Sequence, residues 1–370
     1  MSQPVSSDTF ELLHSGRDYF PALLKAIAGA RRRIVMETYL FADDTTGNAV
    51  RDALMAAAAR GVAVTLTLDG FGSGDYGRQL AVQLVAAGIQ ASVYRPKRWW
   101  QAGLSPKLLR RLHRKLSVFD DDLAFVGGIN IVDDLNHTPH TDSDLGPRFD
   151  FALRCTGSMV AAISRVLLHR RQPAIPLQSV WNARAALLVR DNLFNRNRIQ
   201  KMYLKLLASA RHEVWLANAY FVPGFRFRRA LVKATERGVQ VHVLCQGRKE
   251  YFLQHHATQA LYGQLLGAGV NVYEYTASFL HAKVAAVDGV RVTIGSSNID
   301  PFSLLLAKEA NALLNDVDIA RALQSALQTA CQGAIHINPQ APRPWLVRVV
   351  DWAAYGLLRL GMLVAVRQRY

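Results

Sequence analysis

The chain has 370 residues, half of them apolar, which is enough for two globular domains with sizeable cores. Its 44 lysines and arginines against 28 aspartates and glutamates give a formal charge of +16, which favours a polyanionic partner, either nucleic acid or an anionic bilayer. The cysteines, Cys155, Cys245 and Cys331, are far apart, so the sequence argues against a disulfide framework or zinc site and favours a reducing compartment. Residues 1–16 show no signal peptide, and we expect a protein that stays on the cytoplasmic side.

The first predicted elements alternate between helices and strands. Residues 23–41, 53–70 and 84–95 each read as a helix rich in alanine and leucine, followed by a short strand of β-branched residues. Gly61 and Gly88 stand where a helix should end and a strand begin. Strands that alternate with helices indicate α/β layers with a mostly parallel sheet.

A basic segment, residues 96–111, follows the third helix–strand pair and carries Trp99 and Trp100. It has two readings, which the sequence leaves open. It is either a solvated loop or a lip that contacts lipid headgroups, because tryptophan and basic side chains both favour the membrane interface.

The second half of the chain repeats the first. Residues 203–221, 230–247 and 265–276 again read as helix–strand pairs in the same order, with Gly238 and Gly269 at the ends of helices. The repeat predicts two tandem α/β lobes related by a pseudo-twofold axis. In each lobe we expect a mostly parallel sheet flanked by helices.

In both halves the third pair leads to the same constellation of polar residues. HRKLSVFDDDLAFVGGIN at residues 113–130 and HAKVAAVDGVRVTIGSSN at residues 281–298 both fit the pattern His-x-Lys-x4-Asp-x6-Gly-(Gly/Ser)-x-Asn. A six-position pattern repeated at corresponding points of an internal repeat is very specific. The candidate catalytic residues are His113, Lys115, Asp120, His281, Lys283 and Asp288, and the candidate substrate-binding residues are Gly128, Asn130, Ser296 and Asn298.

The spacing of each motif has a physical meaning. A histidine and a lysine two residues apart on a strand face the same side, and a hairpin returns the asparagine to them. Two such motifs supply two imidazoles and several donors, which is the set that phosphodiester exchange needs. One imidazole attacks phosphorus, a second protonates the departing alkoxide, and lysine and asparagine stabilise the growing charge. The sequence shows no P-loop, His-Glu-x-x-His motif or acidic metal cluster, so we expect covalent catalysis with no metal and no cofactor.

On these motifs the chain resembles the phospholipase D superfamily, whose members carry two His-Lys-Asp motifs on two fused α/β lobes. The match covers roughly residues 10–330. Within the superfamily the chain is similar to bacterial cardiolipin synthases of the short, B type. The stretches that carry this similarity are ETYLF, LDGFGS, LHRKLSVFDDDLAFVGGIN, ANAYFVPG, LHAKVAAVDG and GSSNIDPFSLLLAKEAN.

The resemblance implies an active site at the junction of the two phospholipase D-like lobes and roles for several residues. His113 would be the nucleophile and His281 the acid and then the base, an order that the symmetry of the motifs alone cannot decide. Asp150 and Glu309 correspond to the acids that orient a catalytic histidine. Gly128 departs from the family, which more often has serine there, so the first half would lack a hydroxyl that the second half has.

Other polar residues receive weaker assignments. Although they belong to the motif, Asp120 and Asp288 are expected to be structural and to pair with backbone or lysine near the hairpin. Glu37 is a weaker pocket candidate. We expect the remaining histidines of interest to lie in loops or on the surface, namely His137, His140, His255 and His256.

The composition changes near the C-terminus, and we divide the chain into residues 1–175, 176–338 and 339–370. In the last segment a helix over Trp345–Val366 would be about 33 Å long, close to the roughly 30 Å of a bilayer core. Charged residues interrupt it, however, and each costs roughly 2.5–3.5 kcal/mol at the centre of a membrane span.

The polar residues of this C-terminal helix fall on one face. They are Arg348, Asp351, Tyr355 and Arg359. A narrow polar stripe on an apolar helix fits an interfacial, membrane-associating helix better than a span. The alternative is a helix that packs on the protein's own core.

The leading function is a cardiolipin synthase that transfers a phosphatidyl group from one phosphatidylglycerol to the glycerol headgroup of another, through a phosphatidyl-histidine intermediate. A hydrolytic phospholipase D or a nuclease of the same superfamily is the first alternative, and a non-catalytic membrane-binding protein is the second. We expect a phospholipid substrate and an anionic membrane surface as partners, with nucleic acid disfavoured, and a peripheral location at the cytoplasmic face of the bacterial inner membrane. The second donor lipid, phosphatidylglycerol or phosphatidylethanolamine, and any protein partner stay open.

Overall fold

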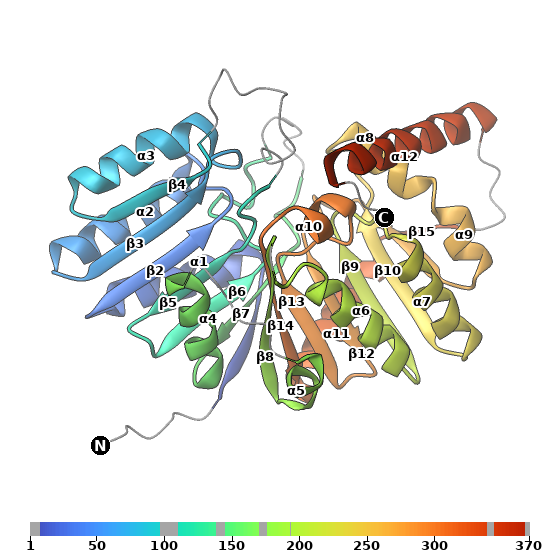
Figure 1. The fold of residues 1–370 in the computed structure, drawn as a ribbon, viewed down its shortest axis with the longest axis horizontal. Coiled ribbons are helices and arrows are strands. Elements are labelled where there is room, and N and C mark those ends of the chain that lie inside the picture. The colour runs from blue at the N-terminus through green and yellow to red at the C-terminus, as the bar shows by residue number, and fades with distance from the viewer. Residues whose placement is uncertain are drawn as a thin grey trace.

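The computed structural model describes residues 8–96, 110–137, 145–169, 176–192, 194–338 and 344–366. The chain forms two lobes, each built on one sheet with helices packed against it, and the two sheets meet at the centre of the molecule (Figure 1). The two-lobed α/β fold that the repeat predicts is therefore confirmed.

The first lobe holds the elements up to residue 168. In chain order they are β1 (Phe10–His14), α1 (Ser15–Gly29), β2 (Arg33–Thr38), α2 (Thr45–Ala59), β3 (Ala63–Asp69), α3 (Gly74–Ala86), β4 (Gln90–Tyr94), β5 (Leu116–Phe119), β6 (Leu123–Gly127), β7 (Phe151–Cys155) and α4 (Ser158–Leu168).

The second lobe holds the remaining elements. They are α5 (Leu177–Asn182), β8 (Ala185–Arg190), α6 (Arg198–Ser209), β9 (Glu213–Asn218), α7 (Phe225–Glu236), β10 (Gln240–Gln246), α8 (Phe252–Gln259), α9 (Tyr262–Gly267), β11 (Asn271–Tyr275), β12 (Lys283–Val287), β13 (Arg291–Gly295), α10 (Pro301–Leu305), β14 (Glu309–Asn315), α11 (Val317–Gln332), β15 (Ile335–His336) and α12 (Trp345–Val366).

The two sheets are mixed rather than mostly parallel, which corrects the expectation from the sequence. The strand order is β1-β7-β6-β5-β2-β3-β4 in the first sheet and β15-β11-β10-β9-β12-β13-β14-β8 in the second. The strands of the helix–strand pairs, β2-β3-β4 and β9-β10-β11, run parallel. The motif strands form antiparallel hairpins, β5-β6 and β12-β13, and insert beside β2 and β9. Antiparallel pairs need only a tight turn, so the motif adds two such strands to each sheet without a crossover helix.

Local sequence explains the repeated helix–strand pairs. In α6 the buried side chains recur at spacings of three and four, as Ile199, Met202, Leu206 and their neighbours, so one face of the helix covers the sheet. Burying a leucine such as Leu206 stabilises the fold by roughly 1.5–3 kcal/mol. The helices α2 and α7 end near Gly61 and Gly238, whose φ angles of 89° and 83° suit glycine and turn the chain into the next strand.

The two lobes join through reciprocal backbone hydrogen bonds beside the motifs. The amide of His113 donates to the carbonyl of Lys308 at 2.9 Å, and the amide of His281 donates to the carbonyl of Phe149 at the same distance. Each bond crosses from one lobe to the other. The chain segments before the two motif hairpins are therefore held side by side with near-twofold symmetry.

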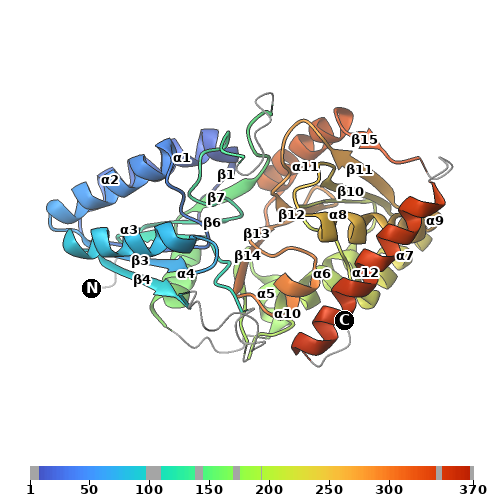
Figure 2. The ribbon, with the colours of Figure 1, turned by 90° about the horizontal axis from the view of Figure 1, so that it is seen from above.

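The helix α12 packs on the second lobe instead of standing apart as a tail. It lies along α8, and its last turns lie near α10, as both views show (Figures 1 and 2). The prediction of a helix over Trp345–Val366 is confirmed. Within the described part of the chain, no helix combines the length and the apolar character that a membrane span requires.

Candidate active site

A cavity of about 750 Å³ lies between the lobes and is open to solvent. Both lobes line it, and both motif histidines, His113 and His281, reach its wall. Asn130 and Asn298, the last residues of the two motifs, also line it. The hairpins thus return each asparagine to its histidine, as the motif spacing predicts.

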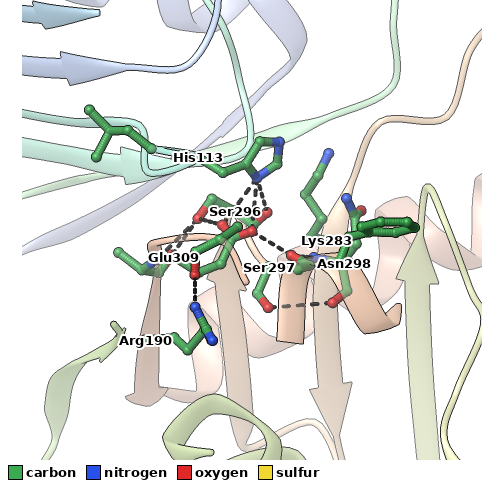
Figure 3. A network of polar contacts seen from close by, with 12 residues as sticks. His113, Arg190, Lys283, Ser296, Ser297, Asn298 and Glu309 are labelled. Carbon is green, nitrogen blue, oxygen red and sulfur yellow. Dashed lines mark hydrogen bonds and ion pairs between the residues drawn. The ribbon is translucent and has the colours of Figure 1, made fainter. Parts of the chain in front are cut away.

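The His113 ring of the first lobe is held by an acid of the second lobe. Its Nδ1 lies 3.1 Å from Oε2 of Glu309 and 3.0 Å from the carbonyl oxygen of Ser296 (Figure 3). Glu309 is fully buried at the start of β14, and it accepts hydrogen bonds from the hydroxyls of Ser296, at 2.5 Å, and Ser303. Burial alone would raise the pKa of Glu309, but His113 and these donors hold it below its usual value.

The His281 ring of the second lobe is held in the same way by the first lobe. Its Nδ1 lies 2.6 Å from Oδ2 of Asp150, which directly precedes β7. The acids therefore cross over: Asp150 follows the first motif and orients the second histidine, while Glu309 follows the second motif and orients the first. With Nδ1 engaged by an acid, each histidine keeps Nε2 for the cavity.

The pKa values of Asp150 and Glu309 are shifted in opposite directions. Burial raises the pKa of Asp150 to about 7, although Lys283 and the amide of Phe151, at 2.8 Å, act against this shift. Position 128 is glycine, so it offers Asp150 no hydroxyl, and a Cβ there would overlap Oδ1 of Asp150. The replacement of serine by Gly128, which the sequence analysis pointed out, therefore leaves Asp150 without a hydroxyl donor at this position.

The two motif lysines are buried beneath the histidines. Lys115 and Lys283 are 4% and 0% exposed, and each donates its ammonium to the carbonyl of the histidine two residues earlier, at 2.8 Å for Lys115. Burial lowers the pKa of Lys115 to about 7 and that of Lys283 to about 8, and the ammonium of Lys283 contributes to the shift of Lys115. Burial also lowers the pKa of His113, and burial with both lysines lowers that of His281.

Two acids of the motif lie outside the cavity, which corrects their place among the catalytic candidates. Asp120 accepts the backbone amides of residues 31–33 at 2.7–2.9 Å, and Asp288 accepts those of residues 211–213 at 2.8–3.0 Å. Burial opposes the shift, but these amides hold the pKa of both carboxyls below the usual range. Their bonds tie each motif hairpin to the start of β2 or β9, as the structural expectation proposed.

Three further assignments need correction. Ser296 and Gly128 do not line the cavity, because the Ser296 hydroxyl turns to Glu309 and Gly128 lies against Asp150. Glu37 does not reach the cavity either, since it forms an ion pair with Arg114 at 2.8 Å.

The described minor histidines, His137, His255 and His256, do not line the cavity, but the sequence prediction was wrong for the position of His256. His137 lies in a loop with its ring buried, and His255 is half-buried on α8. His256 is neither in a loop nor on the surface: it is buried on α8, and its Nδ1 lies 2.7 Å from Oδ1 of Asp351 in α12. His140, like Trp99 and Trp100, lies outside the described residues.

The structure adds residues that the motif analysis missed. Ser303 binds Glu309, and Asp300, whose pKa burial raises to about 7, caps α10 and lines the cavity. Arg190 is 2% exposed and donates to the backbone carbonyls of Leu304 and Ala307, which holds the segment that leads into β14 and Glu309. The Asp-Pro step at residues 300–301, which favours a helix start, was the one local signal for this segment.

The cavity lining carries groups that suit a phosphate and a polyol. Arg148 and Arg111 both line it, and the guanidinium carbon of Arg111 lies 4.1 Å from the centre of the Phe71 ring. The hydroxyl of Tyr220 donates to Glu250 at 2.7 Å, and both residues line the wall. Among the described residues, no group of three or more His, Cys, Asp or Glu is placed to hold a metal ion.

Comparisons with known proteins agree with this geometry. Residues 23–136 and 203–330 match the family described as cardiolipin synthase, phospholipase D-like domain. Cardiolipin synthase B of Salmonella typhimurium is 38% identical over 333 residues, which cover 86% of this chain and 79% of that protein. Cardiolipin synthase 2 of Bacillus anthracis is 31% identical over 94% of this chain and 69% of its own length.

The fold has a counterpart among solved structures. Phosphatidylserine synthase of Haemophilus influenzae superimposes with a TM-score of 0.73 over 96% of this chain and 95% of that chain, at 13% identity, so the likeness concerns the fold. The resemblance that the two motifs indicate is confirmed. The chain belongs to the cardiolipin synthase family of phospholipase D-like proteins.

Proposed function

We propose that the chain is a cardiolipin synthase that exchanges one phosphodiester for another at a membrane surface. The observation that carries this proposal is the pair of histidines facing one cavity, each held at Nδ1 by an acid from the opposite lobe. The relatives named as cardiolipin synthases support cardiolipin as the product. We take phosphatidylglycerol as the substrate, as the family resemblance implies. Two phosphatidylglycerol molecules would give one cardiolipin and one glycerol, so the exchange needs no nucleotide.

In the first step Nε2 of His113 attacks the phosphorus of the donor lipid. Glu309 accepts the Nδ1–H of His113 and stabilises the positive ring that forms when the N–P bond is made. The P–O bond to the glycerol headgroup breaks, and His281 gives its Nε2 proton to the departing alkoxide. The side chains of Asn130 and Asn298 line the cavity, where they can hydrogen-bond the phosphoryl oxygens. The ammonium charges of Lys115 and Lys283 beneath them stabilise the transition state.

In the second step the headgroup hydroxyl of another phosphatidylglycerol takes the place of the first glycerol. Nε2 of His281 removes its proton, the new oxygen attacks phosphorus, and the N–P bond to His113 breaks. Cardiolipin leaves, and both histidines return to their starting states. Water can replace the lipid alcohol, in which case the product is phosphatidic acid.

The difference between the two acids supports this division of roles. The pKa of Asp150, raised to about 7, lets the His281–Asp150 pair keep a proton that the His113–Glu309 pair gives up. A protonated Asp150 donates to Nδ1 of His281, which leaves the ring proton on Nε2, where the leaving group needs it. As Nε2 loses this proton, Nδ1 takes the one from Asp150.

We also place the protein at the cytoplasmic face of the bacterial inner membrane as a peripheral enzyme. The substrate is a membrane lipid, and the formal charge of +16 favours an anionic surface. Arg111 and Arg148 in the cavity suit phosphate groups, of which the donor and the acceptor lipid each carry one.

The test replaces each histidine in turn. We expect His113→Ala and His281→Ala to lower cardiolipin formation from detergent-dispersed phosphatidylglycerol by about 10²–10⁴-fold or more. His212→Ala, an exposed histidine at the start of the second lobe's sheet, is the matched control and should leave the rate unchanged. Near-normal turnover by either motif variant would overturn the two-imidazole mechanism.

A further inference from the structure

The helix α12 exposes a row of large apolar side chains. All of them are more than a third exposed: Trp345, Leu346, Val349, Val350, Trp352, Leu357 and Leu360. They cover the outer side of the helix along most of its length. A monomeric protein in water rarely leaves such a continuous apolar face uncovered.

The opposite side of α12 faces the protein and carries the acid and hydroxyl of its polar stripe. Asp351 is 1% exposed and contacts His256 of α8, and Tyr355 accepts a hydrogen bond from Arg228 at 3.1 Å. Ala354 and Leu358 are buried beside them. An ordinary surface helix turns its apolar face to the core and a polar face to water, whereas α12 has apolar side chains on both faces and leaves the larger ones exposed.

The helix α12 packs beside two elements that contribute to the cavity lining. The helix contacts α8 and α10, and Figure 2 shows its last turns beside α10. These two elements carry or adjoin cavity residues: Tyr251 directly precedes α8, and Phe302 lies in α10. Tyr251 and Phe302 are 53% and 37% exposed, and Phe71 of the first lobe, also in the lining, is 53% exposed. Exposed aromatic side chains from both lobes therefore belong to the cavity lining, and two of them lie on or beside elements that α12 contacts.

We infer that the exposed face of α12 inserts into the headgroup and acyl boundary of an anionic bilayer, and so sets the mouth of the cavity against the lipid surface. This inference rests on the proposed function for the identity of the lipid. Arg348 and Arg359 are exposed on the flanks of the apolar row, where their guanidinium groups meet lipid phosphates while Trp345 and Trp352 occupy the interface.

Charge selects the bilayer over a second copy of the chain as the occupant of this face. Two copies would bring together surfaces with the same arginines on molecules of formal charge +16, whereas an anionic bilayer neutralises them. The exposed aromatic side chains of the cavity lining also suit lipid, because aromatic rings favour the membrane interface.

The experiment compares two double variants of the full-length protein. Trp352→Glu with Leu357→Glu places charge on the exposed face of α12. Val82→Glu with Val85→Glu makes the same kind of change on α3 of the first lobe, where the two valines are 72% and 55% exposed. Binding is measured by flotation with phosphatidylcholine vesicles that contain phosphatidylglycerol, at low and at physiological salt.

We expect the α12 variant to bind vesicles at least about tenfold more weakly than the parent, and the α3 variant to bind as the parent does. What binding remains should fall steeply with salt, because exposed charges are screened over about 8 Å at physiological ionic strength. Equal binding by the parent and the α12 variant, or equal loss in both variants, would overturn the inference. So would a change from dimer to monomer in the α12 variant, which would assign the face to a second copy.

A separate measurement keeps this inference distinct from the proposed function. Turnover of phosphatidylglycerol dispersed in detergent micelles needs no bilayer, so the α12 variant should retain the parent's rate there, with an unchanged circular dichroism spectrum. Loss of micellar turnover in a folded α12 variant would mean that the helix shapes the catalytic cavity and does not act by binding the bilayer. Absence of turnover in the parent would contradict the proposed function and would leave the vesicle result to stand by itself.

Discussion

Asp150 and Glu309 occupy equivalent places, but Glu309 accepts two serine hydroxyls and Asp150 accepts none from position 128. Burial raises the pKa of Asp150 to about 7, whereas His113 and, to a smaller extent, the Ser296 hydroxyl overcome burial and hold the pKa of Glu309 below its usual value. In the proposed mechanism, this difference in pKa between Asp150 and Glu309 gives the two half-sites different tasks, proton donation by His281 and nucleophilic attack by His113. It predicts how activity depends on pH.

We expect kcat/KM for dispersed phosphatidylglycerol to fall as pH rises through about 7, because Asp150 has a raised pKa and the His281–Asp150 pair loses its proton there. The ammonium groups of Lys115 and Lys283, with pKa values of about 7 and 8, lose their charge in the same direction. The alkaline decline should therefore involve more than one proton.

Asp150→Asn separates these contributions. The amide keeps a donor to Nδ1 of His281 but cannot pass on a proton, so we expect a rate lower by about 10²–10⁴-fold and a shallower alkaline decline that reflects the lysines alone. The measurement is the pH profile of kcat/KM for parent and variant. An Asp150→Asn variant with the parent's rate and profile would show that the acid has no part in proton transfer.

At the residue scale the motifs predicted which side chains meet, while the division of roles between the two histidines came from the family resemblance and stays a prediction. His113, His281 and the two acids follow from the motifs and the family resemblance. The crossing of Asp150 to His281 and of Glu309 to His113 depends on the packing of one lobe against the other, which no local pattern encodes. The turn of the Ser296 hydroxyl toward Glu309 depends on the pairing of β13 with β14 within the second lobe, which the motif itself does not encode.

At the element scale, each motif hairpin is fixed by the aspartate at its turn. Asp120 and Asp288 have φ angles of 53° and 52°, a left-handed conformation that aspartate tolerates, and each gathers three backbone amides. Asp120 therefore holds β5 in register with β2, and Asp288 holds β12 in register with β9.

We expect Asp288→Ala to lower the free energy of unfolding by about 1–3 kcal/mol, because three amides lose a charged acceptor. The folded variant should keep the parent's KM, since Asp288 lies outside the cavity. Urea unfolding at neutral pH measures the first quantity, with Glu236→Ala on the exposed end of α7 as the control. If the Asp288→Ala variant is as stable as the parent but inactive, Asp288 takes part in catalysis and its structural role is contradicted.

Periodicity predicted the helix–strand pairs, because their signals are local. It gave the wrong strand direction for the sheets, since antiparallel insertion of the motif hairpins beside β2 and β9 depends on distant pairing. The polar stripe of α12 was predicted, but which face is covered was not. That face is decided by His256, which lies 95 residues before Asp351 in the chain.

At the scale of the whole molecule, the duplication produces a site that neither lobe can form alone. Each lobe supplies a histidine for the cavity and an acid for the other lobe's histidine, so the near-twofold packing is itself a requirement of the proposed chemistry. The basic charge and the apolar face of α12 would then bring this shared cavity to a lipid surface. The repeat in the sequence indicated two lobes, while the common cavity emerged only from their packing.

The central claim is a phosphatidyl transfer from one phosphatidylglycerol to another, and product stoichiometry tests it most directly. The purified protein is incubated with phosphatidylglycerol labelled in both the headgroup glycerol and the acyl chains, and the lipid and water-soluble products are separated. The mechanism predicts equal amounts of cardiolipin and free glycerol. Phosphatidic acid and glycerol in place of cardiolipin would make the protein a hydrolase, and unchanged substrate would make it a lipid-binding protein; either result contradicts the account.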